Sequence, residues 1–347
     1  MMRALLIFVS ILSLFSCSNS TDKNNTKTLN YPTHSIPSSD QVLTKIAFGS
    51  CNKHDKPQPM WATISQHQPD LWIWLGDIIY GDTPDTSLLR EKYLAQKTKP
   101  EYAAFIQNTP TIGIWDDHDY GKNDGGKEWK IKKQSKQILL DFLDVSPKAE
   151  VRKREGAYQS FTFGKPNQKV KIILLDSRYF RDPVSKGNKG TLPNQTGDIL
   201  GEAQWIWLEN ELHDTTIQLF LVGNGIQFLS DEHPYEKWAN FPKSRERFIS
   251  LLGKQKKSRI ILLSGDRHHG EIAKLKINDS ILVHEITSSG LTHSYEGLTN
   301  EKNNYRIGDF VNKVHFGMIE IDWQSHTTSL TLRGTENQLY EELKITF

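Results

Sequence analysis

Cysteine, net charge and long apolar runs are all scarce in this sequence. Only Cys17 and Cys51 occur among 347 residues, which excludes zinc fingers, because those need several cysteines at short spacing. The formal net charge is +2, so the composition gives no electrostatic argument for nucleic-acid binding or for a nucleic-acid-binding module. No apolar run reaches the roughly 20 residues that a membrane-spanning helix needs.

The first residues carry the pattern of a targeting signal. Arg3 supplies a positive charge, and the stretch from Ala4 to Phe15 is apolar. This stretch ends in "LFSC", which resembles a bacterial lipobox, in which the cysteine becomes the acylated first residue of the mature protein. A plain signal peptide with a chance cysteine is the alternative. We expect a lipoprotein signal peptide over residues 1–16, lipidation of Cys17, and a flexible polar tether over residues 17–40.

A lipid on Cys17 would attach the protein to a membrane surface, since each buried CH2 contributes about 0.8 kcal/mol. Ser18, which follows, gives no signal for retention in the inner membrane. We therefore expect an exported lipoprotein, periplasmic or at the cell surface, anchored in the outer membrane. Cys51 then has no disulfide partner, and an unpaired thiol in an exported protein is a liability unless it is buried or bound.

Residues 41–347 have the pattern of a single layered α/β domain. Short apolar runs typical of buried strands alternate with amphipathic stretches typical of helices, and alternating strands follow near the C-terminus. The pattern predicts buried strands within 43–51, 69–77, 109–119, 169–180, 217–228 and 258–269, and helices within 59–68, 87–107, 132–145, 200–214 and 241–255. Antiparallel strands are predicted within 279–290, 315–323 and 327–335.

Polar side chains gather where the predicted buried strands end. The strands run into "GSCNKHD", "GDIIYGD", "DDHDYGKND", "DSRYFRD", "GNGIQF" and "GDRHHGE". One such Gly-Asp is typical of an ordinary turn, but ligand sites of α/β folds form at the carboxyl ends of strands. Converging carboxylates repel one another unless a positive charge lies among them, and a metal ion supplies that charge. A thiolate and a phenolate among the donors favour a strongly Lewis-acidic ion, iron before zinc.

Five of these motifs occur in the order found in a known family. With "FGSC", "LGDIIYGD", "WDDHDYG", "LLDSRYFRD" and "LSGDRHHGE", roughly residues 43 to 330 resemble the alkaline phosphatase D (PhoD-like) family of the calcineurin-like metallophosphoesterase superfamily. The resemblance implies a four-layer α/β/β/α sandwich of two facing mixed sheets. It also implies a phosphoric ester hydrolase, either a phosphomonoesterase or a phosphodiesterase, whose substrate is a phosphate ester. A noncatalytic metal-binding surface lipoprotein and a hydrolase of another ester are the alternatives.

The resemblance implies a set of ligands for two kinds of ion, Fe(3+) with Ca(2+) or with another divalent ion such as Mg, Mn or Zn. Cys51 and Tyr80 match ligands of the iron-like ion, and Asp77 matches the carboxylate that bridges two ions. His268 falls where the superfamily has a histidine ligand of the first ion. Asp266 falls where it has a histidine ligand of the second ion.

The motif "DDH" supplies the remaining predicted site residues. Asp117 replaces an asparagine as ligand of the second ion, and Asp116 is a further ligand or a partner that orients His118. His118 falls where the superfamily has its general acid or transition-state stabiliser. Arg178 matches either a substrate-phosphate contact or an ordinary ion pair with Asp176.

Three departures from the superfamily pattern bear on the site. Oxygen ligands replace imidazole around the second ion, which favours a hard ion such as calcium or magnesium there. Gln227 or Asn224 lies where the superfamily has another metal-binding histidine, so ligation at that strand is doubtful. Asp82 has no role in the matched pattern and is interpreted as a turn residue. The sequence leaves the physiological substrate and the oligomeric state open.

Overall fold

The computed structural model describes residues 31–255 and 259–347 of the chain. The predicted signal peptide, Cys17 and most of the predicted tether lie outside the described residues. A compact unit begins at Pro32, whereas the tether is predicted to continue to residue 40. That boundary is wrong by several residues, because His34 is buried with its Nε2 2.7 Å from the Tyr102 hydroxyl, and Ser39 O accepts a hydrogen bond from Gly164 N.

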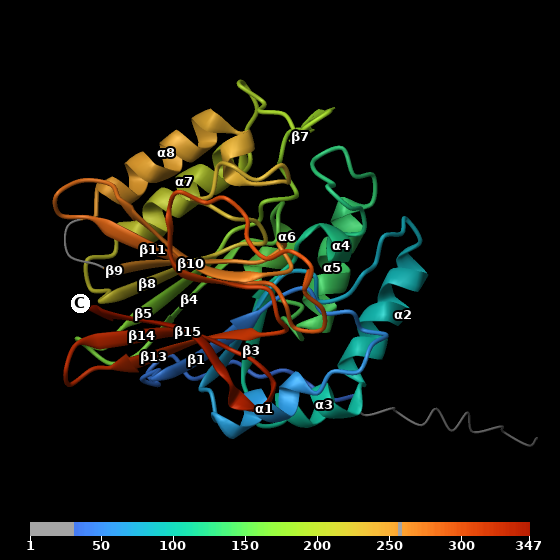
Figure 1. Cartoon of the computed structure of the whole chain (residues 1–347). Coiled ribbons are helices and arrows are strands. Elements are labelled where there is room, and N and C mark those ends of the chain that lie inside the picture. The colour runs from blue at the N-terminus through green and yellow to red at the C-terminus, as the bar shows by residue number, and fades with distance from the viewer. Residues whose placement is uncertain (1–30, 256–258) are drawn as a thin grey trace, which may run out of the picture. The chain divides into compact units, whose positions relative to one another are not determined.

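The first large sheet combines parallel strands from the N-terminal half with antiparallel strands from the C-terminus (Figure 1). The three N-terminal strands are parallel to one another, and the three C-terminal strands continue the sheet beside the first of them, each antiparallel to its neighbour. The predicted antiparallel pairing of 315–323 with 327–335 is therefore confirmed. Its order is β15 (Leu339–Thr346), β14 (Thr327–Arg333), β13 (Phe316–Asp322), β1 (Lys45–Gly49), β2 (Leu71–Leu75) and β3 (Thr111–Ile114).

The second large sheet has four parallel strands in its middle and antiparallel strands at its edges. Its order is β12 (Arg306–Val311), β10 (Gly270–Lys276), β11 (Leu282–Ser288), β9 (Arg259–Ser264), β8 (Leu219–Gly223), β5 (Val170–Leu174) and β4 (Gln159–Phe163). A separate small hairpin joins β6 (Lys186–Gly187) to β7 (Gly190–Thr191). Both large sheets are thus mixed, as expected.

Helices lie outside both sheets, so the predicted α/β/β/α layering is confirmed (Figure 1). The helices of the first half are α1 (Met60–Gln66), α2 (Thr86–Lys97), α3 (Pro100–Ile106), α4 (Asp117–Tyr120), α5 (Lys132–Phe142) and α6 (Glu150–Lys153). Those of the second half are α7 (Gly201–Leu212), α8 (Pro242–Gly253) and the 3-10 turns η1 (Trp238–Asn240) and η2 (Thr335–Asn337). None of the helices among the described residues has the length and apolarity needed to span a bilayer.

The helix predicted within 87–107 is two helices. Lys99 has an extended backbone with ψ of 125°, and Pro100 opens α3 at its first position. The proline ring disfavours helical geometry in the residue before it, so the chain turns between α2 and α3.

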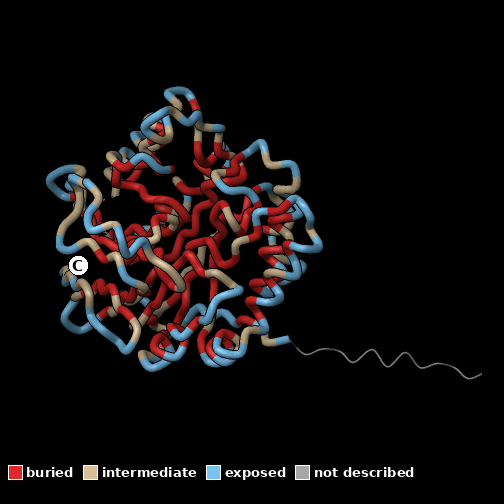
Figure 2. Tube along the Cα trace, turned by 45° about the vertical axis from the view of Figure 1, so that its right-hand side comes forward, coloured by how far each residue is buried: buried red, intermediate tan, exposed pale blue. Residues whose placement is uncertain are grey.

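Alternate side chains of the central strands serve two separate cores. On β8, Leu219 and Leu221 belong to the core that includes residues of the facing sheet, whereas Phe220 and Val222 pack with the helices α7 and α8. This alternation follows from the two-residue period of a strand, and it explains why these strands are apolar on both faces. The buried tube segments fill the centre of Figure 2 accordingly.

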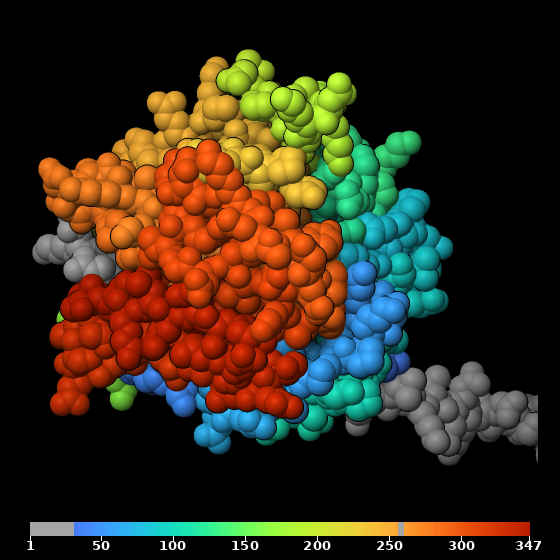
Figure 3. All heavy atoms as spheres, viewed as in Figure 1, coloured from blue at the N-terminus to red at the C-terminus, as the bar shows by residue number. Residues whose placement is uncertain are grey.

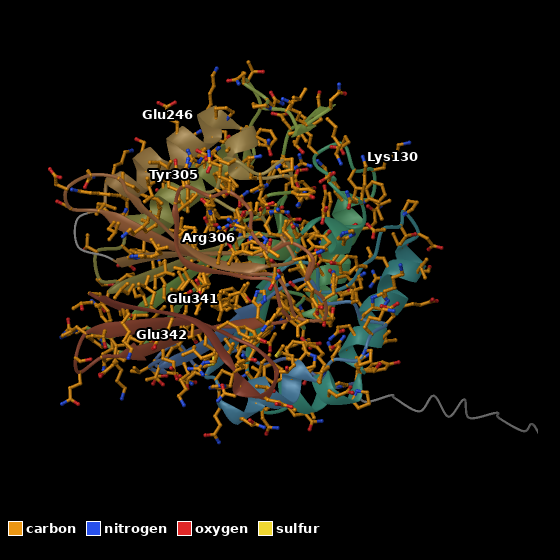
Figure 4. The ribbon with its side chains drawn as sticks, viewed as in Figure 1. Lys130, Glu246, Tyr305, Arg306, Glu341 and Glu342 are labelled. Atoms are coloured by element: carbon orange, nitrogen blue, oxygen red, sulfur yellow. The ribbon has the colours of Figure 1, made fainter. Side chains whose placement is uncertain are left out.

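The sequence pattern missed the edge strands β4, β12 and β15, the strand β10 beside β12, and the short strands β6 and β7. On this side the two sheets approach each other: Asp309 N on β12 donates a hydrogen bond to Glu341 Oε2 on β15 at 2.6 Å. Figure 4 labels Arg306 on β12, and Glu341 and Glu342 on β15. Most side chains of β4, β12 and β15 are exposed or only partly buried, so these strands lack the apolar run that marks a fully buried strand.

Candidate metal centre

The predicted ligands follow the carboxyl ends of parallel strands in both sheets. Cys51 follows β1, Asp77 follows β2, and Asp117 follows β3, all in the first sheet. Asp266 and His268 follow β9 in the second sheet. The edges of the facing sheets therefore present their ligands to one another, as the strand-end pattern predicts.

The structure brings these side chains into three interlocking groups, in each of which the ligand atoms lie within 4.8 Å of one another. The first group contains a thiol, a carboxylate and an imidazole, and the third contains carboxylates alone. Asp77 belongs to the first and second groups, and Asp117 to the second and third. The groups are Cys51, Asp77 and His268; Asp77, Asp117 and His118; and Asp116, Asp117 and Asp266.

The soft donors lie at one end of the cluster. Cys51 Sγ donates to Asp77 Oδ2 at 3.4 Å, and the Tyr80 hydroxyl lies 3.0 Å from His268 Nε2. The same hydroxyl lies 3.0 Å from His293 Nε2, a contact that sequence reasoning did not assign. His293 follows the end of the parallel strand β11, so the strand-end rule was the signal that could have found it.

The carboxylates form the other end of the cluster, and backbone groups orient the central one. Asp117 Oδ1 accepts a hydrogen bond from His118 N at 2.8 Å, and its Oδ2 accepts one from Asp124 N at 2.7 Å. Asp116 and Asp266 complete the group. Burial and the charge of Asp117 raise the pKa of the Asp266 carboxyl to about 7.

Several atoms of the cluster lack the partners that buried polar atoms normally have. Asp77 Oδ1, Asp116 Oδ2 and His268 Nδ1 are buried without a hydrogen-bond partner. Burial, followed by the charge of Asp117, raises the pKa of the Asp77 carboxyl well above its usual range. Burial lowers the pKa of His268 to about 3, which leaves its imidazole neutral and able to bind a cation. The donor set thus fits cations.

Four candidate ligands have left-handed backbone conformations that residues other than glycine seldom adopt. The φ angles are 59° at Cys51, 49° at Asp77, 66° at Asp266 and 54° at His268. Strain of this kind accumulates at functional sites, where the surrounding structure enforces it. The backbone of Gly225 also packs closely against a candidate ligand, since an added Cβ would lie 2.0 Å from Asp116 Oδ1.

His118 lies on α4 and is held by Asp82, the residue interpreted as a turn residue. His118 Nδ1 lies 2.7 Å from Asp82 Oδ2, and the ring lies 4.1 Å from the Tyr80 ring, centroid to centroid. Burial alone would lower the pKa of His118, but the hydrogen bond to Asp82 and the charges of Asp77 and Asp117 raise it to about 10. The interpretation of Asp82 was therefore incomplete, because its positive φ of 45° also aims its carboxylate at the histidine.

Arg178 is fully buried, and its guanidinium is bonded to carboxylates. Its Nε donates to Asp116 Oδ1 at 2.6 Å, its Nη2 lies 2.6 Å from the same oxygen, and its Nη1 pairs with Glu236. Glu236 also pairs with Arg181 at 2.9 Å. Arg178 thus contacts Asp116, a predicted ligand, and a contact between Arg178 and substrate stays a prediction.

The amides at the superfamily's remaining histidine position are engaged elsewhere. Gln227 Nε2 donates to Glu271 Oε1 at 2.6 Å and to Thr287 Oγ1 at 2.9 Å. Asn224 Oδ1 accepts a hydrogen bond from Trp238 Nε1 at 3.1 Å.

Comparisons with known proteins identify the family to which the chain is similar. The description of the PhoD-like phosphatase family matches residues 46–332. Alkaline phosphatase D of Bacillus subtilis (strain 168) is 24% identical over 305 residues, which cover 73% of this chain and 50% of that protein. This chain therefore spans about half the length of that curated relative.

Two solved structures share the fold. A structure of PhoD superposes with a TM-score of 0.70 at 18% identity, covering 90% of this chain and 70% of the other. A dimetal phosphatase from Danio rerio superposes with a TM-score of 0.56 at 13% identity, covering 88% and 100%. At these identities the superpositions show the fold alone. The match to residues 46–332 spans most of the chain, and the protein belongs to the PhoD-like phosphatase family.

Proposed function

We propose that this protein is a metal-dependent phosphoester hydrolase that acts on monoesters, diesters or both. The observation that carries the proposal is the chain of three ligand groups, in which Asp77 and Asp117 are each shared. Shared carboxylates are what a site for two or more neighbouring cations requires. The match to the PhoD-like family supports a phosphate ester as the substrate.

The two ends of the cluster differ in chemistry, which supports unlike cations. Cys51, Tyr80 and His268 offer a thiolate, a phenolate and an imidazole, which suit iron in its trivalent state. Asp116 and Asp266 offer only carboxylate oxygens, which suit calcium or another hard divalent ion. When bound, such cations supply Lewis acidity, which neutralises phosphoryl charge and lowers the pKa of a water nucleophile.

The side chains around the cations hold and orient groups. His118, fixed by its 2.7 Å contact with Asp82, carries its proton at the edge of the cluster and can donate it to the leaving oxygen. Arg178 holds Asp116 through its 2.6 Å hydrogen bond, so it acts as a positioning residue for the carboxylate end of the site. Such outer contacts keep ligands in place and tune the cations.

Replacing Asp77 by asparagine tests the proposal. Purified Asp77→Asn should lose bound metal and hydrolysis of p-nitrophenyl phosphate and of its bis ester, because one shared ligand is removed. Asp70→Asn is the matched control at the opposite end of the same strand, where Asp70 Oδ2 accepts hydrogen bonds from Thr44 N, Thr44 Oγ1 and Lys45 N. Elemental analysis gives the metal content. Full metal content and full rate in Asp77→Asn would contradict the proposal, and metal without turnover in the wild type would indicate a noncatalytic metal-binding protein.

The location belongs to the same proposal. The lipobox-like "LFSC" supports an exported lipoprotein that is anchored through Cys17 in the outer membrane. Membrane fractionation of wild type and Cys17→Ala tests this part. Equal release of both proteins into the soluble fraction would contradict the anchor.

A further inference from the structure

Two tyrosine side chains lie at the surface next to the candidate metal-binding motif Asp266-Arg267-His268, which follows β9. Tyr235 is 51% exposed in the segment between β8 and η1, and Tyr295 is 48% exposed in the segment after β11. Tyr31 is the other tyrosine with comparable exposure in the part of the chain that the structure describes. A single exposed ring is ordinary, but tyrosines are enriched at binding surfaces, so two exposed rings beside a candidate site suggest recognition.

Each of the two rings rests on a residue of the Asp266-Arg267-His268 motif. The Arg267 guanidinium carbon lies 4.3 Å from the centroid of the Tyr235 ring. The Tyr295 ring lies 4.7 Å from the His268 ring, centroid to centroid, and Tyr295 N donates to His268 O at 3.2 Å. Because His268 is a candidate ligand, Tyr295 is separated from the metal centre by a single side chain.

Polar contacts hold Arg267 and His268, the residues on which the two rings pack. Arg267 Nη2 lies 2.8 Å from each carboxylate oxygen of Glu301, and Ser294 Oγ donates to His268 O at 2.7 Å. The two segments are also joined directly, since Asn304 N donates to Glu232 Oε2 at 2.8 Å. They lie side by side on the face shown in Figure 3.

The chemistry of this surface favours a planar ring as its partner. Glu301 already neutralises Arg267, so the surface offers aromatic faces rather than a free charge. The rings are held in place before any ligand arrives, so stacking on them would cost little side-chain entropy. The charge of a phosphoryl group is met at the ligand cluster, which leaves the organic part of an ester to lie over the tyrosines.

We infer that Tyr235 and Tyr295 form a stacking surface that selects phosphoesters whose organic group carries a planar ring, either a nucleobase or an aryl group. The inference rests on the proposed hydrolase function and names the substrate class for the same site. Stacking of a base on an aromatic side chain is worth about 1–3 kcal/mol, which corresponds to about 5- to 160-fold in kcat/KM.

Two pairs of substrates test the inference without changing the bond that is cleaved. Adenosine 5′-monophosphate and ribose 5-phosphate are both cleaved at the primary 5-hydroxyl of a ribose and differ in the base that the ribose carries. Bis(p-nitrophenyl) phosphate and methyl p-nitrophenyl phosphate share the same leaving phenolate and differ in the retained ring. The wild type should favour the member with the additional ring in at least one pair by about 5- to 160-fold in kcat/KM. The pair that shows the preference tells a nucleobase from an aryl group.

Variants assign the preference to the tyrosines. Tyr295→Leu and Tyr235→Leu should reduce the ring preference towards unity at unchanged metal content, whereas Tyr295→Phe and Tyr235→Phe should keep it. Ile206→Ala on α7 removes another exposed apolar side chain, 54% exposed, and should change nothing. Should Tyr235→Leu fail to fold because Arg267 loses its cover, Tyr295→Leu alone still decides the matter.

The failures of the two proposals can be told apart. Hydrolysis of all substrates without a ring preference, or a preference that survives both leucine variants, would overturn the stacking surface and leave the hydrolase intact. Hydrolysis of none of them by metal-loaded wild type would overturn the hydrolase and the stacking surface together.

Discussion

Replacing Arg178 by glutamine separates the two roles that an Asp-x-Arg pattern allows. In the structure the Arg178 guanidinium is fully buried between Asp116 and Glu236. Removing it leaves Asp116 without its charged partner, while Glu236 keeps Arg181 at 2.9 Å. Breaking a buried ion pair in this way costs about 3–5 kcal/mol, because one charge stays buried and uncompensated.

The loss should be visible as a change in melting temperature. A domain of this size shifts its Tm by about 2 °C per kcal/mol, so Arg178→Gln should melt about 6–10 °C below the wild type. Metal content should fall as well, because Asp116 loses the contact that holds it at the carboxylate end of the site. Differential scanning calorimetry and elemental analysis measure the two effects.

An exposed pair provides the control. Arg90 and Asp141 lie 2.8 Å apart with side chains 54% and 46% exposed, and such a pair is worth at most about 1 kcal/mol. Arg90→Gln should therefore change the Tm by no more than about 2 °C. The reasoning is refuted if Arg178→Gln keeps the Tm and metal content of the wild type while KM for a phosphoester rises tenfold, since that result means that Arg178 binds substrate.

Three further predictions concern other contacts. Gly225→Ala should deplete the second cation, because its Cβ would lie 2.0 Å from Asp116 Oδ1, whereas Gly297→Ala, with open space around it, should be silent in elemental analysis. Asp82→Ala should lower kcat about 10- to 100-fold with KM little changed in steady-state kinetics, because the His118 ring loses its 2.7 Å contact. Burial lowers the pKa of His315 to about 4, so below pH 6.5 the unfolded chain binds a proton that the folded chain does not bind. The free energy of unfolding should therefore fall by about 3 kcal/mol between pH 6.5 and 4. If the Tm of His315→Gln declines as much as that of the wild type over this range, His315 is not the cause.

The clustering of the candidate ligands could be predicted because it depends on a local rule, whereas the role proposed for each ligand came from the likeness to the family. Parallel strands that are apolar on both faces are easy to locate, and their carboxyl ends meet at one edge of a sheet. Cys51, Asp77, Asp117 and Asp266 each follow such a strand, and the structure brings all of them into ligand groups. The likeness to the family added the expected arrangement of two facing sheets.

The remaining features depend on contacts between distant parts of the chain. Arg178 meets Glu236, which is 58 positions away, and no local pattern predicts that partner or the burial that decides the role of the arginine. His118 meets Asp82 across 36 positions, through a left-handed turn at the aspartate. The insertion of β13 beside β1 likewise joins the two ends of the chain.

Backbone strain and buried carboxylates in the candidate ligand cluster oppose folding. Cys51, Asp77, Asp266 and His268 adopt left-handed backbone angles, and strain of this kind costs on the order of 1 kcal/mol or more per residue. Buried carboxylates, of which Asp77 and Asp116 each keep an oxygen without a partner, add a cost of desolvation. Domains have only about 5–15 kcal/mol of net stability, so such a cluster takes up a large part of it. Cations bound to the folded chain would offset both terms, because the unpartnered oxygens of Asp77 and Asp116 would hold them. The residues that oppose folding are therefore the same residues that are candidate ligands of the cations. We expect the stability and the activity of this protein to depend on the same ions.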